Sequence, residues 1–177
     1  MSDEAWCASW RDGVALADAS IWCDAPRQRE LCFVSCAPAV GSVRHGQLVA
    51  TAATFGLLGA VRSRRATQPE TELAVPLGRP FSLGERRLEL FASGHCLGAA
   101  SLVLETAQQR VCFAGAVHPA GTPLAGVGDV RRCDALIVDA RGASESRPPY
   151  LEAAAQLAER VTTITARGGA AAVAYTH

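Results

Sequence analysis

The segment most able to carry chemistry is the stretch 93–98, in which Gly94 and Gly98 flank His95. Glycine lets the backbone approach its neighbours closely, so this pattern predicts a tight loop from which the imidazole projects. Histidine titrates near neutral pH and is a common metal ligand, so the loop could offer ligation or proton transfer. A second candidate is Cys36, which follows the buried-looking run 32–35 at a strand–loop–helix corner.

Short apolar runs bounded by turn residues predict the strands that would position these side chains. The expected strands are 14–16, 20–23, 31–35, 88–92, 100–105, 110–114, 135–139 and 170–174. Alanine-rich segments with leucine or valine at helical spacing predict helices over 43–61 and 150–167, the second ending at Gly168 and Gly169 as a C-cap. Stretches 85–87 and 107–110 predict hairpin tips. The fold class is therefore α/β, with helices flanking strands and hairpins.

Composition narrows the functional classes. The chain has 177 residues, 49% of them hydrophobic, so one domain is expected. Seventeen basic and seventeen acidic residues cancel, which disfavours autonomous nucleic-acid binding without excluding it. Seven cysteines without a Cys-x-x-Cys pair argue against both a disulfide framework and a zinc ribbon, so most are expected to be buried. No leader or membrane span is predicted, and a cytoplasmic location is expected.

Five stretches, taken in order, share a pattern with a known family. The most distinctive is Ser-Gly-His-Cys-Leu-Gly-Ala-Ala at 93–100; the others are Cys-Phe-Val-Ser at 32–35, Leu-Val-Ala-Thr-Ala-Ala-Thr at 48–54, Val-Cys-Phe-Ala-Gly-Ala at 111–116 and Cys-Asp-Ala-Leu-Ile-Val-Asp-Ala-Arg-Gly at 133–142. Together they resemble the metallo-β-lactamase-fold nucleases with a β-CASP insertion, the group that includes mRNA 3′-end processing factors and ligase-associated DNA exonucleases. The resemblance covers nearly the whole chain.

This resemblance implies the N-terminal part of an αββα sandwich, with mostly antiparallel or mixed sheets and flanking helices. The expected domain is a single incomplete one over 1–177, with the β-CASP insertion and the C-terminal half of the fold absent. The family's His-x-His-x-Asp-His segment, which holds two zinc ions, falls on Cys36, Pro38, Val40 and Gly41. Its bridging aspartate falls on Ala116. Proline, valine, glycine and alanine offer no side-chain donor, so a two-metal hydrolytic mechanism is not expected.

Some candidate ligands persist under the resemblance. His95 occupies a family ligand position, although it can equally be a hydrogen-bonded loop residue. Cys36 is a possible substitute ligand, although an inert buried thiol is the simpler interpretation. His118 lies two residues beyond Ala116 and would complete a single zinc site with them if the chain there is extended. No cofactor is otherwise expected.

The remaining candidates have structural alternatives. Asp139 ends its strand where the family has a supporting acid, and Asp24 resembles the acid that ends an early strand, but either residue can also have a structural role alone. His45 is expected at an exposed helix position. His177, at the last position, is not expected to act.

The resulting hypothesis is a degenerate nuclease homologue, catalytically inactive, that acts as a binding or scaffold partner. A mononuclear zinc-dependent hydrolase using Cys36, His95 and His118 is the first alternative. A gene remnant without a selected function is the second. If the chain is only part of the sandwich, uncovered sheet surface should promote self-association or binding of a protein partner.

Overall fold

The computed structural model describes residues 8–16, 20–40, 43–61, 71–140, 146 and 148–173. The chain divides into two compact units, Met1–Asp139 and Ala140–His177. The first unit is a mixed α/β structure with two mixed sheets. The second contains one long helix. The predicted fold class is confirmed, while the single domain over 1–177 stays a prediction.

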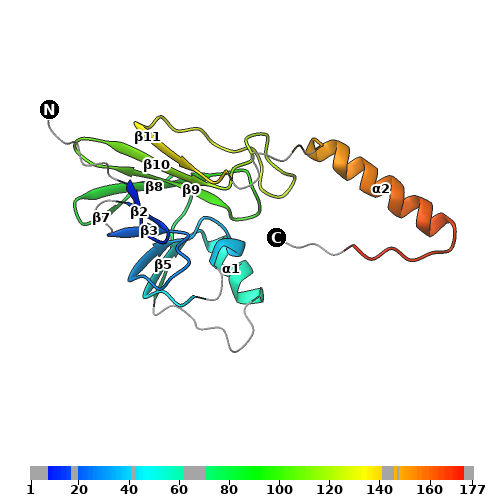
Figure 1. The fold of residues 1–177 in the computed structure, drawn as a ribbon, viewed down its shortest axis with the longest axis horizontal. Coiled ribbons are helices and arrows are strands. Elements are labelled where there is room, and N and C mark those ends of the chain that lie inside the picture. The colour runs from blue at the N-terminus through cyan, green and yellow to red at the C-terminus, as the bar shows by residue number, and fades with distance from the viewer. Residues whose placement is uncertain are drawn as a thin grey trace. The chain divides into compact units, whose positions relative to one another are not determined.

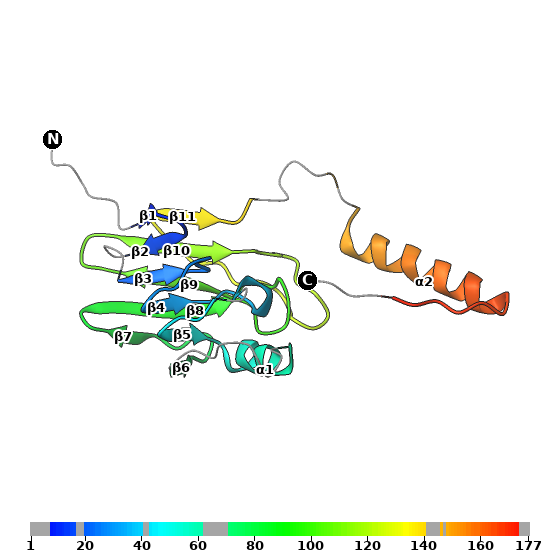
Figure 2. The same cartoon turned by 60° about the horizontal axis from the view of Figure 1, so that its bottom comes forward.

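The first sheet contains the N-terminal strands, in the spatial order β1-β2-β3-β4-β5-β6. Its strands β2, β3 and β5 are labelled in Figure 1, and the whole order can be followed in Figure 2. Their bounds are β1 (Ala8–Trp10), β2 (Val14–Leu16), β3 (Ile21–Cys23), β4 (Leu31–Phe33), β5 (Gln47–Ala50) and β6 (Thr71–Ala74). The pairs β1–β2 and β2–β3 are antiparallel, whereas β3 to β6 run parallel. The parallel half therefore places the carboxyl ends of β3, β4 and β5 at one edge.

The second sheet follows in sequence and has the order β11-β10-β9-β8-β7. Its strands are β7 (Phe81–Leu83), β8 (Arg86–Ala92), β9 (Ala100–Glu105), β10 (Arg110–Gly115) and β11 (Ala135–Val138). All neighbours are antiparallel except β10 and β11, whose arrows point the same way in Figure 2. Hairpin turns join β7 to β8 and β9 to β10, as predicted.

The main core lies between the two sheets. It draws Leu16, Ile21, Phe33 and Val49 from the first sheet, and it is completed by Leu88, Leu90, Leu102, Leu104, Val111 and Phe113 from the second. Residues of a strand alternate between its two faces, so each strand contributes every second side chain to this layer. Phe33 and Phe113 meet edge to face across it, with ring centroids 6.2 Å apart.

Helix α1 (Ala52–Val61) covers the outer face of the first sheet. Phe55 and Leu58 pack there against Trp22, Cys32 and Leu48. The short 3-10 helix η1 (Ala37–Val40) follows β4 and adds Ala37 and Ala39 to the same cluster. One side of the sandwich thus has the helical cover that the α/β prediction requires.

The second unit consists of α2 (Tyr150–Ala166) and the chain that follows it. None of the described α2 residues is buried within the structure. The helix ends in a Schellman motif, in which Gly168 N–H bonds the Thr165 carbonyl and Gly169 N–H bonds the Ile164 carbonyl, both at 3.0 Å. Gly168 has φ 76°, so the predicted C-cap is confirmed.

Two predicted elements are wrong. The expected helix 43–61 is a strand, β5, followed by the shorter α1. Leu48, Val49 and Ala50 are all buried because β5 lies inside a parallel sheet, and such a continuous apolar run resembles a buried helix in sequence. The expected strand 170–174 is absent from its described part, 170–173, which is exposed and irregular. Alanine has low strand propensity, so this run needed a partner strand to become one.

Four short strands were not predicted: β1, β5, β6 and β7. β1, β6 and β7 are exposed or half-buried throughout, so they lack the apolar run that marked the equally short β2, β3 and β4.

Candidate functional site

The residues singled out by the sequence lie mainly where strands of both sheets end on one side of the sandwich. We call this side the loop edge. It comprises Asp24, Ser35, Cys36, Thr51, Thr54, Cys96, Gly98 and Gly115. Asp24 directly follows β3, and Ser35 lies two residues after the end of β4. Thr51 directly follows β5, and Cys96 lies in the loop between β8 and β9. Segments far apart in sequence therefore meet here.

Asp24 is held tightly by Ser35. The Ser35 hydroxyl donates to one carboxylate oxygen at 2.5 Å, and the Ser35 N–H donates to the other at 2.8 Å. Asp24 has φ 44°, a left-handed conformation that is uncommon outside glycine but several-fold enriched in Asp. Bonds of this charge-assisted kind are stronger than neutral ones and offset the cost of that backbone conformation. Asp24 thus makes hydrogen bonds within the protein, and its role as a supporting acid stays a prediction.

Thr51 and Thr54 connect the start of α1 to the loop of His95. Thr51 accepts a hydrogen bond from Thr54 N–H at 3.1 Å, the arrangement of a helix N-cap. Both hydroxyls donate to the Gly98 carbonyl, at 2.7 and 2.9 Å. Gly98 has φ 78°, and an added Cβ there would lie 2.6 Å from Thr54 N. Only glycine fits, which explains one of the two glycines flanking His95.

Ser35 also joins the sheets. Its carbonyl accepts a hydrogen bond from Ala100 N–H, at the start of β9, at 2.8 Å. Gly115, at the end of β10 with φ 61°, approaches so closely that an added Cβ would lie 2.9 Å from Ser35 Cβ. At this edge, the backbone at the end of β10 in the second sheet therefore packs directly against the Ser35 side chain of the first sheet.

Cys36 and Cys96 form a buried cluster with Ala99, and Ala39 packs against it. The Cys36 thiol donates a hydrogen bond to the Cys96 sulfur, which lowers the pKa of Cys96 to about 7. The same hydrogen bond, with burial, raises the pKa of Cys36 far above its ordinary value. Cys36 is thus a protonated buried thiol at neutral pH, in agreement with the interpretation that it is not itself a thiolate.

His95 and His118 come near one another through Ser93. The Ser93 carbonyl accepts from His118 N–H at 3.0 Å, and the Ser93 hydroxyl accepts from His95 N–H at 3.4 Å. His95 lies in the loop between antiparallel strands β8 and β9, as predicted, and both imidazoles are half-buried. Asp139 N–H donates to the Gly115 carbonyl at 3.0 Å, which places Asp139 beside the end of β10.

These residues do not gather into a metal centre. Within the described part of the chain, no three His, Cys, Asp or Glu side chains lie together in a way that could hold a metal ion. Cys36, His95 and His118 thus do not form such a group, and the single-zinc hypothesis stays a prediction. Gly41, one of the family's ligand positions, lies outside the described residues.

One histidine prediction is wrong. His45 is 1% exposed and precedes β5 instead of lying on an exposed helix. Its Nδ1 accepts a hydrogen bond from Arg29 N–H at 3.2 Å. A buried imidazole needs such a partner, and the chain provides it from a segment sixteen residues earlier, which sequence proximity does not reveal. His177 lies outside the described residues.

Most of the described cysteines are buried, as predicted, and Cys7 lies outside the described residues. Cys23, Cys32, Cys36, Cys96 and Cys112 are buried free thiols, and Cys133 is half-buried. Burial raises the pKa of Cys32 and of Cys112 to about 12. Among the described cysteines that have a shifted pKa, Cys96 is the one whose pKa is lowered. The sequence named Cys96 only as part of a motif and missed its contact with Cys36, although the resemblance already placed both loops at one site.

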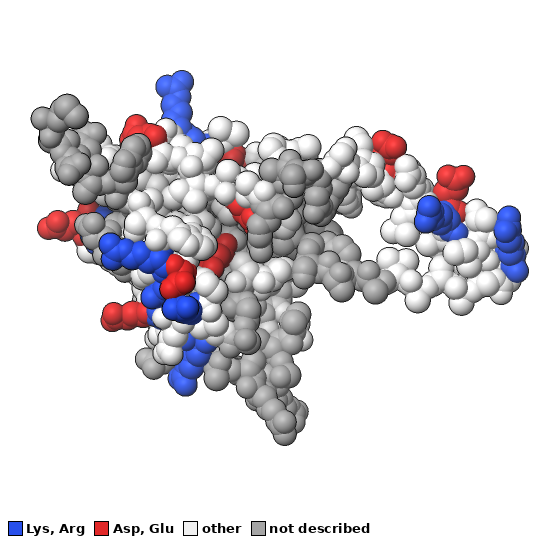
Figure 3. Space-filling model, viewed as in Figure 1, with Lys and Arg blue, Asp and Glu red and all other residues white. Residues whose placement is uncertain are grey.

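The surface carries charges of both signs. On the face in Figure 3, acidic and basic side chains lie interspersed. Arg27 pairs with Asp12 at 2.9 Å, and Arg131 pairs with Glu89 at 2.9 Å. No helix of the described residues is long and apolar enough to cross a membrane.

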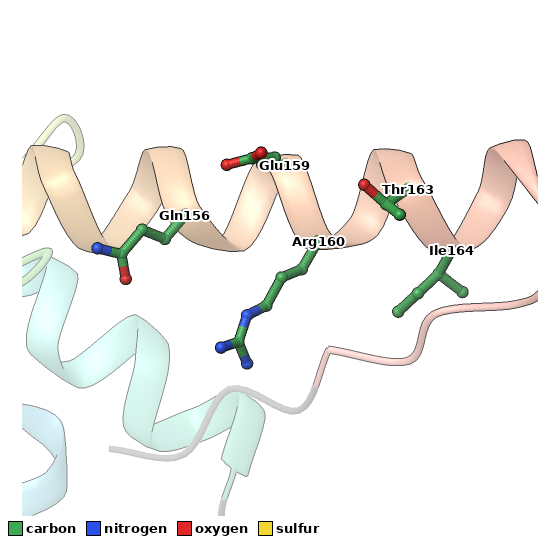
Figure 4. Close-up of a pocket in the computed structure, with 5 residues that line it drawn as sticks. All are labelled: Gln156, Glu159, Arg160, Thr163 and Ile164. Carbon is green, nitrogen blue, oxygen red and sulfur yellow. The ribbon is translucent and has the colours of Figure 1, made fainter.

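A hollow of about 430 Å³ lies along α2 in the second unit (Figure 4). It is lined by Gln156, Glu159, Arg160, Thr163 and Ile164. Gln156, Arg160 and Ile164 project from one side of the helix, at the spacing of successive turns. All five side chains are exposed, so the hollow lacks the enclosed lining of a ligand site.

Comparison with known proteins returned only structural similarities. No protein-family model matches the chain, and no curated protein matches it. Among solved structures, a metallo-β-lactamase from Cronobacter sakazakii with a HARLDQ motif is similar over 55% of this chain and 41% of its own, at 20% identity and a TM-score of 0.36. The metallo-β-lactamase fold protein YhfI from Bacillus subtilis is similar over 64% and 56%, at 11% identity and a TM-score of 0.35. The chain thus spans about half the length of these two structures.

Proposed function

We propose that this chain is a non-hydrolytic relative of the metallo-β-lactamase-fold nucleases, built on the N-terminal part of their αββα sandwich, and that it acts as a binding or scaffold protein. One observation carries the proposal. At the loop edge, where the resemblance puts metal ions, Asp24, Thr51 and Thr54 hydrogen-bond to protein groups, and Cys36 lies in one buried cluster with Cys96. These contacts cross-link the loops, which is a structural role.

The ligand positions support the same conclusion. Pro38 and Ala116 have no metal-binding atoms in their side chains, and the same is true of Val40 and Gly41. A two-metal hydrolase needs both ions clamped to polarise the phosphate and generate hydroxide near neutral pH. With four of these ligand positions carrying no donor, the β-CASP-type nuclease reaction has no basis in this chain.

The test is metal content together with hydrolysis. The chain, purified without chelator, should contain no stoichiometric zinc by elemental analysis. It should also cleave neither bis(p-nitrophenyl) phosphate nor single-stranded RNA above background in zinc or manganese, and His95→Ala should change neither result. One zinc ion per chain, lost together with hydrolysis in His95→Ala but kept in the surface variant Leu124→Ala, would replace this proposal by the zinc hydrolase.

The binding role needs a contact surface, and β11 offers one. Among the described residues, β11 is one of the two outer strands of its sheet, and its sequence is Ala-Leu-Ile-Val. Leu136 and Val138 point away from the core and are 62% and 47% exposed. An apolar edge strand without charge or proline is a template for strand pairing. We therefore propose that a second copy of the chain pairs at this edge.

Sedimentation of the full chain at micromolar concentrations tests this contact. The wild type should associate, and Leu136→Asp with Val138→Asp should shift it toward the monomer. Leu77→Asp is the matched control, since Leu77 is 44% exposed on a different segment. A wild type that stays monomeric at all concentrations would reject the second copy as partner and leave the inactive-site proposal untouched.

A further inference from the structure

Helix α2 carries an apolar stripe, and no described residue of the helix is buried. The stripe consists of Tyr150, Ala154, Leu157, Val161 and Ile164, which follow one another at alternating spacings of four and three residues. Residues at this spacing lie along one side of a helix. Tyr150, Leu157 and Ile164 are 46%, 47% and 42% exposed. A helix with such a stripe is typical of an element that packs against another surface.

The outer face of β11 is a second exposed apolar surface. Half-buried and exposed residues alternate along 131–140, as they do on a strand with one face open to solvent. Ala135 and Ile137 pack against the core between the sheets, so Leu136 and Val138 point to the outer face. The outer face of the first sheet is covered by α1. An amphipathic helix is therefore the kind of element that fits a face of this kind.

The two surfaces match in length. A helix rises about 1.5 Å per residue, so the stripe from Tyr150 to Ile164 extends over about 21 Å. A strand rises about 3.3 Å per residue, so the outer face from Asp134 to Ala140 extends over about 20 Å. The helix and the strand can therefore cover each other along most of the apolar part of each.

The charges beside the two surfaces are complementary. Arg160 and Ile164 project from one side of α2, whereas Glu159 projects from the other, so Arg160 flanks the stripe (Figure 4). On the outer face of β11, Asp134 is exposed just before the apolar pair. A helix that lies on this face antiparallel to the strand brings Arg160 toward Asp134. Arg132, two residues before Asp134, then lies toward the C-terminal end of the helix, where a cation is favourable.

We propose that two copies of the chain exchange their α2 helices, so that each α2 lies on the outer face of β11 in the partner copy. This inference rests on the proposed association of two copies and names the segment of the second copy that binds. Every chain carries both surfaces, so a two-fold arrangement covers both of them in each copy. The helix covers side chains of the face, and the edge of β11 stays available for backbone pairing in the same dimer.

Charge exchange between two variants tests the contact. In a dimer of Asp134→Arg, both contacts bring two arginines together, and in a dimer of Arg160→Asp they bring two aspartates together. Each variant alone should therefore associate more weakly than the wild type, by roughly two- to tenfold in Kd. An equimolar mixture should regain wild-type association, because each contact of the mixed dimer joins an arginine to an aspartate. Sedimentation with a fluorescent label on only one variant detects the mixed dimer.

Charges placed within the stripe should have a larger effect. Leu157→Asp with Ile164→Asp should leave the full chain monomeric at micromolar concentrations at which the wild type is dimeric. Ala155→Asp with Thr162→Asp is the matched control, because it adds the same two charges, also seven residues apart, on the opposite side of α2. The control should associate like the wild type. Circular dichroism compares the helix content of the two variants.

Four outcomes would overturn the proposal. A mixture that associates no better than its two components would mean that α2 does not reach β11 of another copy. Unchanged association of Leu157→Asp with Ile164→Asp would leave pairing at the β11 edge in place without the helix. Loss of association in that variant, but not in Leu136→Asp with Val138→Asp, would assign the stripe to another surface. A wild type that is monomeric at all concentrations would reject the proposed second copy as well.

Discussion

The layer between the sheets and the loop edge are held together in different ways. The layer is apolar, and its contacts, such as Phe33 against Phe113, need only hydrophobic side chains of suitable volume. The loop edge depends on directed contacts, such as Ser35 with Asp24 and Thr51 with Gly98. A change in the layer should therefore cost stability in proportion to the volume removed, whereas a change at the edge should depend on the individual atom that is lost or added.

This difference also bears on function. The edge has the left-handed Asp24 and close glycine contacts, and backbone strain of this kind commonly marks functional sites. Its polar groups nevertheless hydrogen-bond to other groups of the same chain. Hydrogen bonds within the protein therefore keep the geometry of this edge.

Removing volume from the layer should have the largest effect. Phe33 is fully buried between the sheets, so Phe33→Ala should lower the free energy of unfolding by about 3–5 kcal/mol, through lost burial and the cavity that remains. Urea denaturation followed by circular dichroism measures it. Leu124→Ala, at a residue 76% exposed, should change stability by less than about 0.5 kcal/mol. Similar losses in both variants would mean that the layer is not the main core.

Adding one methyl group at the loop edge should come next. In Gly98→Ala the new Cβ would meet Thr54 N at 2.6 Å in addition to the left-handed backbone cost. We expect a loss of about 2–4 kcal/mol. Gly78→Ala is the control, because Gly78 has φ 71° with no atom within 4 Å of an added Cβ, and it should lose only about 1–2 kcal/mol. Equal losses would show that the close contact with α1 contributes nothing.

Deleting one hydroxyl at the edge should have a smaller effect. Ser35→Ala removes the 2.5 Å hydrogen bond to the Asp24 carboxylate while leaving the backbone N–H bond in place. A bond to a charged group contributes about 1.5–3 kcal/mol, so thermal and urea unfolding should show a loss in that range. Ser82→Ala, at an exposed position of β7, should be neutral. A neutral Ser35→Ala would break the claim that the edge depends on directed bonds.

Cys36→Ala should have the smallest effect on stability but a clear effect on the reactivity of Cys96. Its lowered pKa of about 7 means that the thiolate fraction rises as pH increases through 7 and is complete well above it. The rate of iodoacetamide labelling at Cys96, followed by peptide mass spectrometry from pH 5 to 9, should therefore have its midpoint near 7. Cys36→Ala removes the hydrogen bond that lowers this pKa, so the midpoint should move to higher pH. An unchanged midpoint would mean that Cys36 does not stabilise the thiolate.

Much of the fold was predictable because it depends on local patterns. Alternating and continuous apolar runs predicted seven of the strands, and the glycine pair after α2 predicted its C-cap. The helix expected over 43–61 was wrong because an apolar run buried on both faces has the same composition in a strand and in a helix. Only pairing of β5 with β4 and β6 decides between them.

For the site, the resemblance predicted that no two-metal centre forms, since the side chains of Pro38, Val40, Gly41 and Ala116 carry no metal-binding atom, and this stays a prediction. The sequence also predicted that His95 lies in a tight loop between strands. Only the tertiary structure decided which groups meet there: Cys36 with Cys96 from 60 positions away, Thr51 with Gly98, and His45 with Arg29. Side-chain chemistry belongs to each residue, but hydrogen bonds and shifted pKa values depend on distance and burial, and these are set when both sheets pack into one core.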